Sequence, residues 1–239
     1  MISRDVVRRV VSISWWFSQL RDAWLNAWDV RSQTPFAKIY RTIRPYTMCG
    51  NARLRGLYEA VQWIVTSQVP GALVECGTAR GGSAALMGLT LRQLSEDRVL
   101  WLFDTFEGLP PPTKEDPDWN IAKAYTGRCR GTKQEVISLF DRLDILKETK
   151  FVQGLLEETL SSCEIGPIAL LHIDCDWYDS VKACLDHLYD CVSSGGVIQI
   201  DDYGHWAGAR KAVEEFIRAR SLAVRWRRLD YTGRQFIKP

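Results

Sequence analysis

The stretches LLHIDCDWYDS, at residues 170–180, and VIQIDDYG, at residues 197–204, decide the fold of this chain. In each, a short apolar run stops abruptly in carboxylates. The runs at 168–173 and 197–200 are continuous, which is typical of strands buried on both faces of a parallel sheet covered by helices. In open α/β sheets, ligands bind beyond the carboxyl ends of the strands. The two stretches therefore predict a ligand site at one edge of such a sheet.

Four aspartates stand at these two predicted strand ends: Asp174, Asp176, Asp201 and Asp202. Crowding four acids together is costly unless a cation or shared protons compensate for their charge. A set made only of oxygen ligands suits a hard divalent ion such as Mg²⁺. The competing interpretation is that Asp176 or Asp202 only caps the helix that follows it. Taken as a set, the four aspartates favour a site.

Most of the remaining chain is predicted to alternate strands with helices. Residues 223–228 and 234–238 alternate in polarity and predict a terminal hairpin. Helices between successive strands imply a doubly wound α/β sheet, mostly parallel, that ends in this antiparallel hairpin. Gly195 and Gly196 are expected to turn into the last parallel strand. Further strands are expected at 72–76, 99–103 and 151–152, and helices at 54–67, 81–94, 132–143, 155–162, 180–192 and 207–220.

Length and composition suit a single α/β domain with an extension, since the chain has 239 residues of which 46% are hydrophobic. The formal net charge of +2 identifies no class of partner, and no nucleic-acid partner is expected. The seven cysteines are an odd number without metal-ligand spacing, which argues against a disulfide framework or a zinc site. Cys76 and Cys175 lie in strand-like runs and are expected to be buried thiols, which fits a reducing cytoplasm.

The sequence predicts neither a transmembrane helix nor a secretory signal. A membrane span needs roughly 18 or more consecutive apolar residues, and no such run is present. Arg8 and Arg9 interrupt the apolar part of the N-terminus, and no small-residue cleavage pattern follows.

The N-terminal arm, residues 4–28, has apolar residues at roughly helical spacing and is predicted to form one or two helices. A membrane-surface helix would combine such an apolar face with basic residues, but acids dilute the charge here. Packing against the domain or against a second subunit, as in a dimer, is therefore favoured. The arm is rich in tryptophan, with Trp15, Trp16, Trp24 and Trp28.

Residues 31–55 contain basic side chains and no acid. Such a stretch is compatible with an anion or nucleic-acid patch. Because it is short and the rest of the chain is not basic, a solvated loop face or an active-site flap is favoured. The basic side chains are Arg31, Lys38, Arg41, Arg44, Arg53 and Arg55.

The turn at residues 74–83 joins the first predicted strand to its helix through the pattern E-x-G-x-x-x-G-G. Its glycines allow a ligand to approach the backbone, but the spacing is not that of a pyrophosphate-binding loop. Asp104 ends the next strand, where an acid accepts hydrogen bonds from ribose hydroxyls, or serves only as a turn or cap residue. A ribose acceptor without a phosphate loop fits S-adenosylmethionine. Glu75 and the amides near Gly81 are then expected to meet its amine and carboxylate.

Four motifs in order, VECGTARGGSA, FDTFEGLP, LLHIDCDWYDS and IDDYG, resemble the macrocin O-methyltransferase family. Members methylate sugar hydroxyls of macrolide and aminocoumarin antibiotics with S-adenosylmethionine and Mg²⁺. The resemblance extends from about residue 46 to residue 216. It implies a seven-stranded Rossmann-like methyltransferase fold, a methyltransferase domain at 51–239, and a helical arm with an active-site flap at 1–50. The arm is expected to shape the acceptor pocket or a dimer contact.

Carried onto this chain, the resemblance assigns roles to the four aspartates. It implies Asp174, Asp201 and Asp202 as metal ligands. Asp176, the second acid of the D-x-D motif, is implied as the general base, with Asp174 as the alternative. A base of this kind contributes about 10²- to 10⁴-fold to the rate.

The resemblance also implies a cofactor site built from both the glycine-rich turn and an upstream segment. The upstream segment is expected to close over the cofactor. The positions implied are Glu75, Gly77, Ser83 and Asp104 in the domain, and Thr47 and Met48 in the closing segment.

The long segment from Glu107 to Arg130 is predicted to be a lid, because loops of this length in compact domains are usually functional. Trp119 and Tyr125 are predicted to stack on a flat acceptor. His205 is expected to line the site, and His172 to point into the packing of the sheet.

Other functions are compatible with parts of this pattern. A phenol or catechol O-methyltransferase would use the same acids, because vicinal hydroxyls also chelate Mg²⁺. A non-catalytic scaffold has no use for clustered charge, and a nicotinamide-dependent oxidoreductase is disfavoured by the missing phosphate loop.

Overall fold

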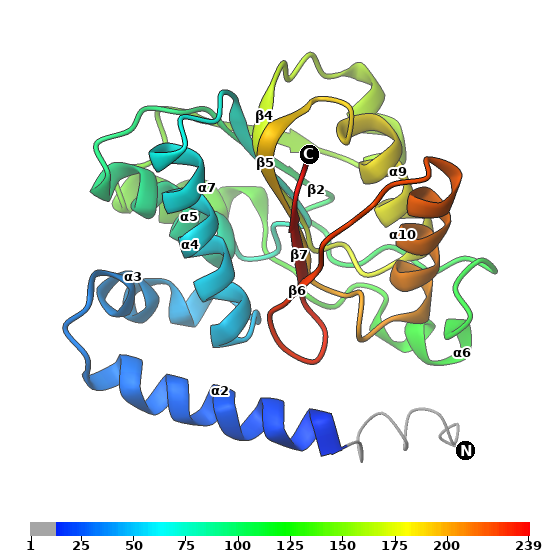
Figure 1. Cartoon of the computed structure of the whole chain (residues 1–239), viewed down its shortest axis with the longest axis horizontal. Coiled ribbons are helices and arrows are strands. Elements are labelled where there is room, and N and C mark those ends of the chain that lie inside the picture. The colour runs from blue at the N-terminus through cyan, green and yellow to red at the C-terminus, as the bar shows by residue number, and fades with distance from the viewer. Residues whose placement is uncertain (1–12) are drawn as a thin grey trace.

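The computed structural model describes residues 13–239, and its centre is a seven-stranded sheet between two layers of helices (Figure 1). The strand order is β3-β2-β1-β4-β5-β7-β6, in which the first five strands are parallel and β7 is antiparallel to both neighbours. The predicted doubly wound sheet with a terminal hairpin is confirmed. The strands are β1 (Ala72–Cys76), β2 (Leu100–Asp104), β3 (Thr149–Gln153), β4 (Ile168–Ile173), β5 (Val192–Ile200), β6 (Arg227–Arg228) and β7 (Arg234–Ile237).

Helices cover both faces of the sheet, as Figure 1 shows from its edge. One face carries α3 (Pro35–Ile43), α4 (Asn51–Thr66), α5 (Gly82–Gln93) and α7 (Lys133–Arg142), and the other carries α8 (Leu156–Thr159), α9 (Tyr178–Leu188) and α10 (Ala207–Ala219). Short helices, α6 (Trp119–Ala122), η1 (Arg44–Tyr46), η2 (Lys123–Tyr125) and η3 (Leu160–Ser162), lie in the connections.

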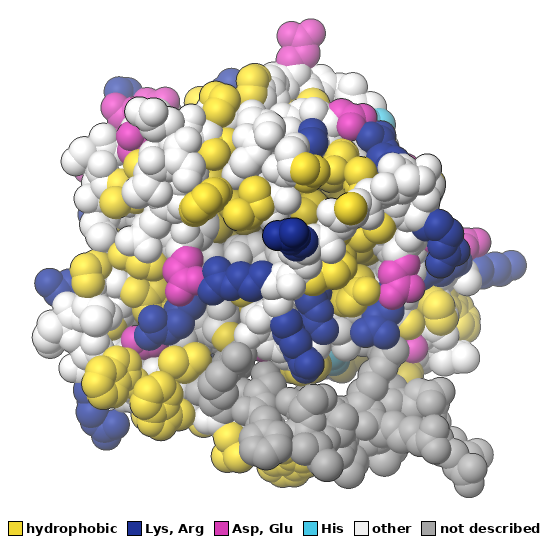
Figure 2. Space-filling view, in the orientation of Figure 1, with side chains coloured by type: hydrophobic (Ala, Val, Ile, Leu, Met, Phe, Trp, Pro, Cys, Tyr) yellow, Lys and Arg dark blue, Asp and Glu magenta, His cyan; other side chains and the backbone are white. Residues whose placement is uncertain are grey.

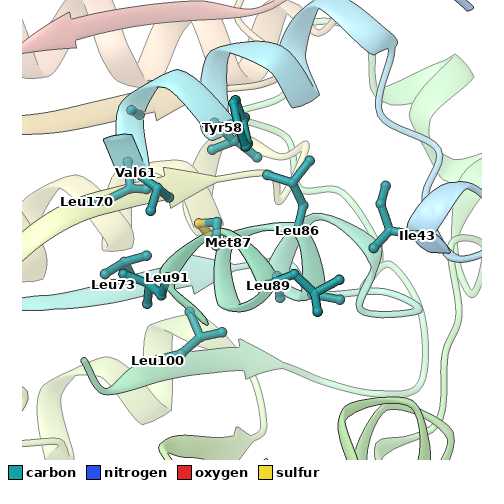
Figure 3. Close-up of a cluster of buried hydrophobic side chains, with 14 of the residues drawn as sticks. Ile43, Tyr58, Val61, Leu73, Leu86, Met87, Leu89, Leu91, Leu100 and Leu170 are labelled. Atoms are coloured by element: carbon teal, nitrogen blue, oxygen red, sulfur yellow. The ribbon is translucent and has the colours of Figure 1, made fainter. Parts of the chain in front are cut away.

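The strands divide the core into two apolar clusters because successive side chains point to opposite faces. On β1, Leu73 packs with α4 and α5, whereas Val74 packs with α9 and α10. Figure 3 shows the first cluster, in which Met87 of α5 lies between the strands and α4. Both faces are thus buried, as the continuous apolar runs predict.

Two side chains from the long segment between β2 and α7 cap helices on the opposite layer. Asp116 accepts a hydrogen bond from the amide of Tyr178 at 2.8 Å, and Asp118 accepts one from the amide of Ala207 at 2.9 Å. The N-termini of α9 and α10 are therefore satisfied from elsewhere in the chain. The interpretation of Asp176 or Asp202 as caps is wrong, because neither helix has a local side-chain cap.

Three predicted boundaries need correction near the end of the sheet. Strand β5 begins at Val192, so the helix expected to reach this residue ends at Leu188 instead. Gly195 and Gly196 lie inside the strand, where its pairing with β4 shifts register. Such a bulge accommodates glycine without ending the strand. The strand expected at 223–228 is reduced to two residues, Arg227 and Arg228.

The N-terminal arm is helical over α2 (Ile13–Arg31), and the predicted residues 4–12 lie outside the described part. The predicted packing of the arm against the domain is confirmed at the end of α2, where the buried Asp29 accepts hydrogen bonds from Asn51 and Arg55 of α4 at 2.8 and 2.5 Å. The side chains of Trp16, Trp24 and Trp28, by contrast, are 56%, 63% and 56% exposed. Figure 2 shows apolar side chains gathered along this edge of the molecule. Trp15 is not described at the side-chain level. Within residues 13–239, no helix has the length and apolar character needed to cross a membrane.

The basic stretch at 31–55 is not a solvated loop. Helix α3 occupies its centre, begun by Thr34 as N-cap and Pro35 in the first turn. Arg55 forms an ion pair with the buried Asp29 at 2.5 Å, and Arg41 donates to backbone carbonyls. Arg41 and Arg55 therefore bond to other parts of the protein and do not form an open basic patch. The division of the chain at residue 50 stays a prediction.

Gly77 is expected to tolerate no side chain, because a Cβ there would lie 1.9 Å from the carbonyl oxygen of Asp174 and its φ is +91°. Gly166 has a similar φ of +76° but open space around the added atom. Gly166→Ala should therefore cost about 1 kcal/mol of unfolding free energy, and Gly77→Ala several times as much. Urea denaturation of both variants measures the difference, and equal losses would contradict the close approach of β1 and β4.

Candidate active site

A cavity of about 280 Å³ opens beyond the carboxyl ends of β1, β2 and β4. This is where the strand order reverses between β1 and β4, the usual ligand position in a doubly wound sheet. Its walls come from segments that lie far apart in the sequence. Among the predicted residues, those that line it are Thr47, Met48, Gly77, Ser83, Asp104, Asp174, Asp176 and Asp202. Glu75 and Asp201 do not line it and have no exposed surface.

Asp104 is held by the turns on either side of it. One carboxylate oxygen accepts the amides of Thr78 and Ala79 at 2.7 and 2.8 Å, and the other accepts the amide of Phe106 at 2.6 Å. Burial raises the pKa of this carboxyl, and the three amide bonds oppose that rise. Asp104 therefore stabilises the two turns, as one of its predicted roles requires, and it also lines the cavity.

The predicted flap lies against the first turn of α5. A Cβ on Gly82 would meet the carbonyl of Tyr46 at 2.6 Å, so the two backbones approach closely. The Thr47 hydroxyl accepts the amide of Cys49 at 3.1 Å and fixes the bend. Met48 is 64% exposed at the cavity. The flap therefore forms one wall opposite the strand ends.

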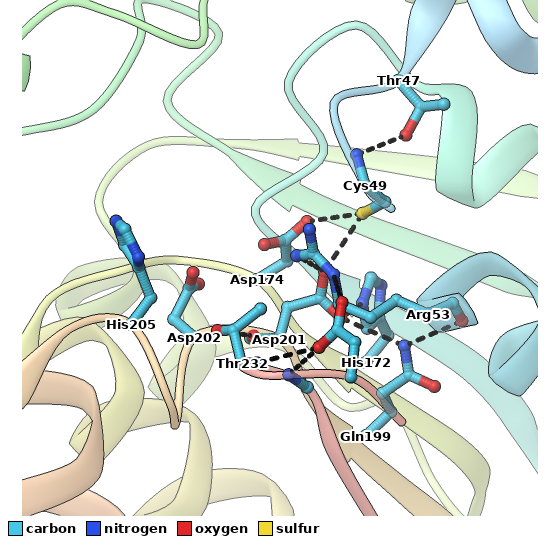
Figure 4. Close-up of polar contacts among 12 residues, drawn as sticks. Thr47, Cys49, Arg53, His172, Asp174, Gln199, Asp201, Asp202, His205 and Thr232 are labelled. Carbon is cyan, nitrogen blue, oxygen red and sulfur yellow. Dashed lines mark hydrogen bonds and ion pairs between the residues drawn. The ribbon is translucent and has the colours of Figure 1, made fainter. Parts of the chain in front are cut away.

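Three of the predicted aspartates line this cavity, and Figure 4 shows the polar contacts around Asp174 and Asp201. Ligand atoms of Cys49, Asp174 and Asp201 lie within 4.8 Å of one another. The Cys49 sulfur is 3.4 Å from Asp174 Oδ2 and 3.1 Å from Asp201 Oδ2. Asp202 accepts the backbone amide of Asp176 at 3.3 Å, which brings the fourth acid to the same edge. The structure thus brings the four predicted aspartates to one edge of the sheet, and among the described residues the group with metal-ligand spacing consists of Asp174, Asp201 and Cys49.

Asp201 differs from the other three because it has strong partners. Arg53 donates to Oδ2 at 2.6 Å, while His172 and Gln199 reach Oδ1 at 3.2 and 3.0 Å. Burial alone would raise the pKa of Asp201, but Arg53 and His172 outweigh it and hold this pKa well below its usual range. Asp201 is therefore a buried carboxylate that stays ionised.

The other three acids carry poorly compensated charge. Burial, followed by repulsion from Asp201, raises the pKa of Asp174 to about 7. Burial raises the pKa of Asp176 to about 6, against the hydrogen bond from Trp206. The pKa of Asp202 is raised well above its usual value by burial and by the neighbouring aspartates. This cluster would be relieved by a cation.

Asp176 is held in an unusual conformation. Its φ is +63°, in the region where side chains are disfavoured. The Trp206 indole donates to its carboxylate at 2.6 Å. Trp206 is itself fixed by edge contacts with Trp177 and Tyr125, whose ring centres lie 4.9 and 5.2 Å away. The orientation of the Asp176 carboxylate is thus fixed by Trp206 and the aromatic rings packed against it.

His172 has a polar role that the sequence analysis missed, since sheet packing was expected. Its Nδ1 is 2.9 Å from Glu75 Oε1, and its Nε2 is 3.2 Å from Asp201 Oδ1. Burial lowers the pKa of His172, but its bonds to the two acids outweigh this and raise the pKa well above the usual value. Burial raises the pKa of Glu75, and the hydrogen bond with His172 opposes part of this rise.

Two further residues of the site were not predicted in their observed roles. Cys49 follows the flap without any metal-ligand spacing, and Arg53 was predicted only as one basic residue of a solvated loop face or an active-site flap. His172 could have been predicted from its position two residues before Asp174, because residues two apart in a strand lie on the same face.

Three aromatic predictions are not met in this cavity. Trp119 is 41% exposed and lies under Lys123, and Tyr125 packs on Trp206. His205 bonds to Tyr231 and lies beside Asp202 in Figure 4. None of the three lines the cavity.

The parallel sheet with its antiparallel end and the cavity at the strand reversal have the form of a Rossmann-like methyltransferase fold, and the comparisons show that the protein is an O-methyltransferase that depends on S-adenosylmethionine. The chain belongs to the macrocin O-methyltransferase family, whose model matches residues 39–238. The expected resemblance is therefore confirmed.

Relatives of known activity agree with this membership. The chain is 34% identical to demethyldecarbamoylnovobiocin O-methyltransferase of Streptomyces niveus over 72% of this chain and 67% of that protein. It is 31% identical to a tetracenomycin rhamnosyl 4'-O-methyltransferase of Streptomyces olivaceus, over 79% and 74% respectively. The solved O-methyltransferase NovP superposes with a TM-score of 0.75 at 30% identity, covering 81% of this chain and 82% of that one.

Metal-free protein should lose stability as pH rises from 5 to 8. The pKa values of Asp174 and Asp176, about 7 and about 6, lie above the unfolded-state value of about 3.9. The folded state therefore retains protons that the unfolded chain has released. Stability is highest below this window and falls on the order of 2–4 kcal/mol across it. Urea denaturation in EDTA at several pH values measures the slope.

Asp201 does not reverse this trend, because its lowered pKa acts only below the window. The raised pKa of His172 works in the same direction as the aspartates. Asp174→Asn should flatten the profile. A stability that is constant or rises between pH 5 and 8 would show that the acids are not crowded as described.

Proposed function

We propose that this enzyme methylates a sugar hydroxyl of a glycosylated natural product, with a divalent cation, Mg²⁺, held at the acid cluster. The proposal rests chiefly on one observation: Asp174 and Asp202, two acids with raised pKa values, line the same cavity as the cofactor-side residues Ser83 and Asp104. Methyl donor, cation and acceptor would then meet in one space.

The balance of charge supports a cation. Glu75 and five aspartates lie in or around the cluster, namely Asp174, Asp176, Asp201, Asp202 and Asp230, against two basic side chains, Arg53 and His172. The oxygen ligands suit Mg²⁺. Asp174, Asp201 and Asp202 are the proposed ligands, with Asp201 already oriented by Arg53. The residues fit the group that the family implies.

The cofactor is proposed to occupy the half of the cavity next to β1 and β2. Asp104 has a carboxylate there for the ribose hydroxyls, since each oxygen can accept more than one hydrogen bond. Gly77 and Ser83 would meet the methionine end. The two buried side-chain atoms without a hydrogen-bond partner among the described residues, Glu75 Oε2 and Thr78 Oγ1, belong to the same turn. Thr47 and Met48 would cover the cofactor.

The acceptor hydroxyl must lose a proton as it attacks the sulfonium methyl group. Asp176 is the proposed base, because its carboxylate lines the cavity and is aimed by Trp206. Asp174 is the alternative. A bound Mg²⁺ lowers the pKa of a coordinated hydroxyl and orients it. Alignment of oxygen, methyl carbon and sulfur supplies a large part of the remaining rate enhancement.

The acceptor class is proposed from the relatives. Two of them act, by name, on a novobiocin precursor and on a rhamnosyl group of tetracenomycin. Leu109, Pro110 and Leu155 give the cavity an apolar side that suits a non-sugar portion of such a molecule. A small glycosylated acceptor is therefore favoured over a free phenol.

Two single substitutions should separate the cofactor site from the cation site. Asp104→Asn removes a carboxylate from the ribose position and should weaken S-adenosylhomocysteine binding by tenfold or more, on the order of 1.4 kcal/mol. Asp202→Asn should leave that binding within about twofold, because Asp202 bonds to the Asp176 amide in the acid cluster and not to the turns that hold Asp104. Isothermal titration in EDTA measures both. Equal losses in the two variants would contradict the proposed division.

Methyl transfer should depend on a divalent ion and on a sugar. The enzyme is incubated with methyl-labelled S-adenosylmethionine and an acceptor panel of nitrophenyl rhamnoside, demethyldecarbamoylnovobiocin and catechol. Label should enter a glycoside, disappear after exhaustive chelation and return with Mg²⁺. Full activity after chelation would refute the metal role, and transfer to catechol alone would refute the sugar acceptor.

A further inference from the structure

A row of polar side chains crosses the apolar centre of the sheet. Glu75 on β1 pairs in register with His172 on β4, which pairs with Gln199 on β5. All three have no exposed surface. Buried polar groups are costly unless they are hydrogen-bonded. In this row the bonds run from Glu75 through His172 to Asp201, at 2.9 and 3.2 Å.

His172 touches both halves of the active site while lining neither. On one side, Glu75 lies beside Ser83, a residue that lines the cavity. On the other side, Asp201 lies 3.1 Å from Cys49, which in turn contacts Asp174. Figure 4 shows His172 in the same cluster of polar contacts as Asp201 and Cys49. One ring therefore joins the cofactor end to the aspartates.

The chain of bonds is incomplete at the cofactor end. Glu75 Oε2 makes no hydrogen bond although it is buried, and the hydroxyl of Thr78 in the same turn is also unpartnered. A ligand that supplies donors and orders this turn would fix the Glu75 carboxylate. Glu75 Oε1 would then hold the imidazole more tightly against Asp201.

We propose that His172 is a positioning residue that couples cofactor binding to cation binding, so that each ligand strengthens the other. The inference rests on the proposed function, because it needs both ligands. Ordering one end of the bonded chain lowers the cost of ordering the other, which gives positive cooperativity. Linkage requires that the factor be the same in both directions.

The coupling is measured without an acceptor. S-adenosylhomocysteine is titrated calorimetrically into the full-length protein in EDTA and again at saturating Mn²⁺. It lacks the sulfonium charge, so direct repulsion of the metal is reduced. Mn²⁺ is titrated by electron paramagnetic resonance with and without S-adenosylhomocysteine. Each ligand should bind about fivefold more tightly in the presence of the other.

Two substitutions cut the chain of bonds at different points. The amide nitrogen of His172→Asn reaches the position of Nδ1 and keeps the bond to Glu75, whereas that of His172→Gln reaches the position of Nε2 and keeps the bond to Asp201. Both should bring the coupling factor within twofold of one. Circular dichroism and urea denaturation establish folding, and either folded variant suffices as a test.

Gln199→Met is the matched control, because Gln199 donates to Asp201 at 3.0 Å but does not contact Glu75. Mn²⁺ affinity should fall in this variant while the coupling stays near fivefold. Independent binding in the wild type, or undiminished coupling in a folded His172 variant, would overturn the inference. Absence of S-adenosylhomocysteine or Mn²⁺ binding to the wild type would instead refute the proposed function.

Discussion

Repulsion among carboxylates at the ends of β4 and β5 is the constraint on which the rest of this site depends. Parallel pairing of the two strands brings Asp174 and Asp201 to one edge of the sheet. The acids that follow them, Asp176 and Asp202, lie in the loops after β4 and β5, and a hydrogen bond of 3.3 Å from the Asp176 amide to the Asp202 carboxylate joins these two loops. The fold therefore concentrates negative charge where a doubly wound sheet binds its ligands.

Side chains from distant parts of the sequence offset part of this charge. Arg53, in the first turn of α4, joins Asp201 to Asp230 at 2.6 and 3.1 Å. It thereby links the flap and α4 to the loop between β6 and β7. His172 Nε2 lies 3.2 Å from Asp201 Oδ1 and is also buried. The compensation is centred on Asp201, which leaves the acids that face the cavity to be balanced by a ligand.

The sequence predicted the scaffold well because its strongest signals are local. Continuous apolar runs ending in acids predict parallel strands, and the predicted ends of β4 agree with the structure. The start of β5 was wrong because Gly195 and Gly196 have the appearance of a turn while a bulge keeps them in the strand.

The acids of the site were found for the same reason, whereas their partners were not. Cys49, Arg53 and His172 have meaning only through contacts with Asp201, between residues 29 to 152 positions apart. Contacts between residues so far apart cannot be predicted from periodicity or from the spacing of residues in the sequence. Trp119 and Tyr125 do not line the cavity, and their stacking on an acceptor stays a prediction, because aromatic composition in a long loop does not determine which way the rings face.

The most direct measurement of the central claim is anomalous diffraction from crystals grown with Mn²⁺ and S-adenosylhomocysteine. One manganese peak should lie among Asp174, Asp201 and Asp202, with carboxylate oxygens at about 2.1 Å, close to the distance typical of Mg²⁺. The adenosine should lie in the same cavity. Crystals that bind the cofactor but show no manganese at the aspartates, or show it elsewhere, would contradict the account.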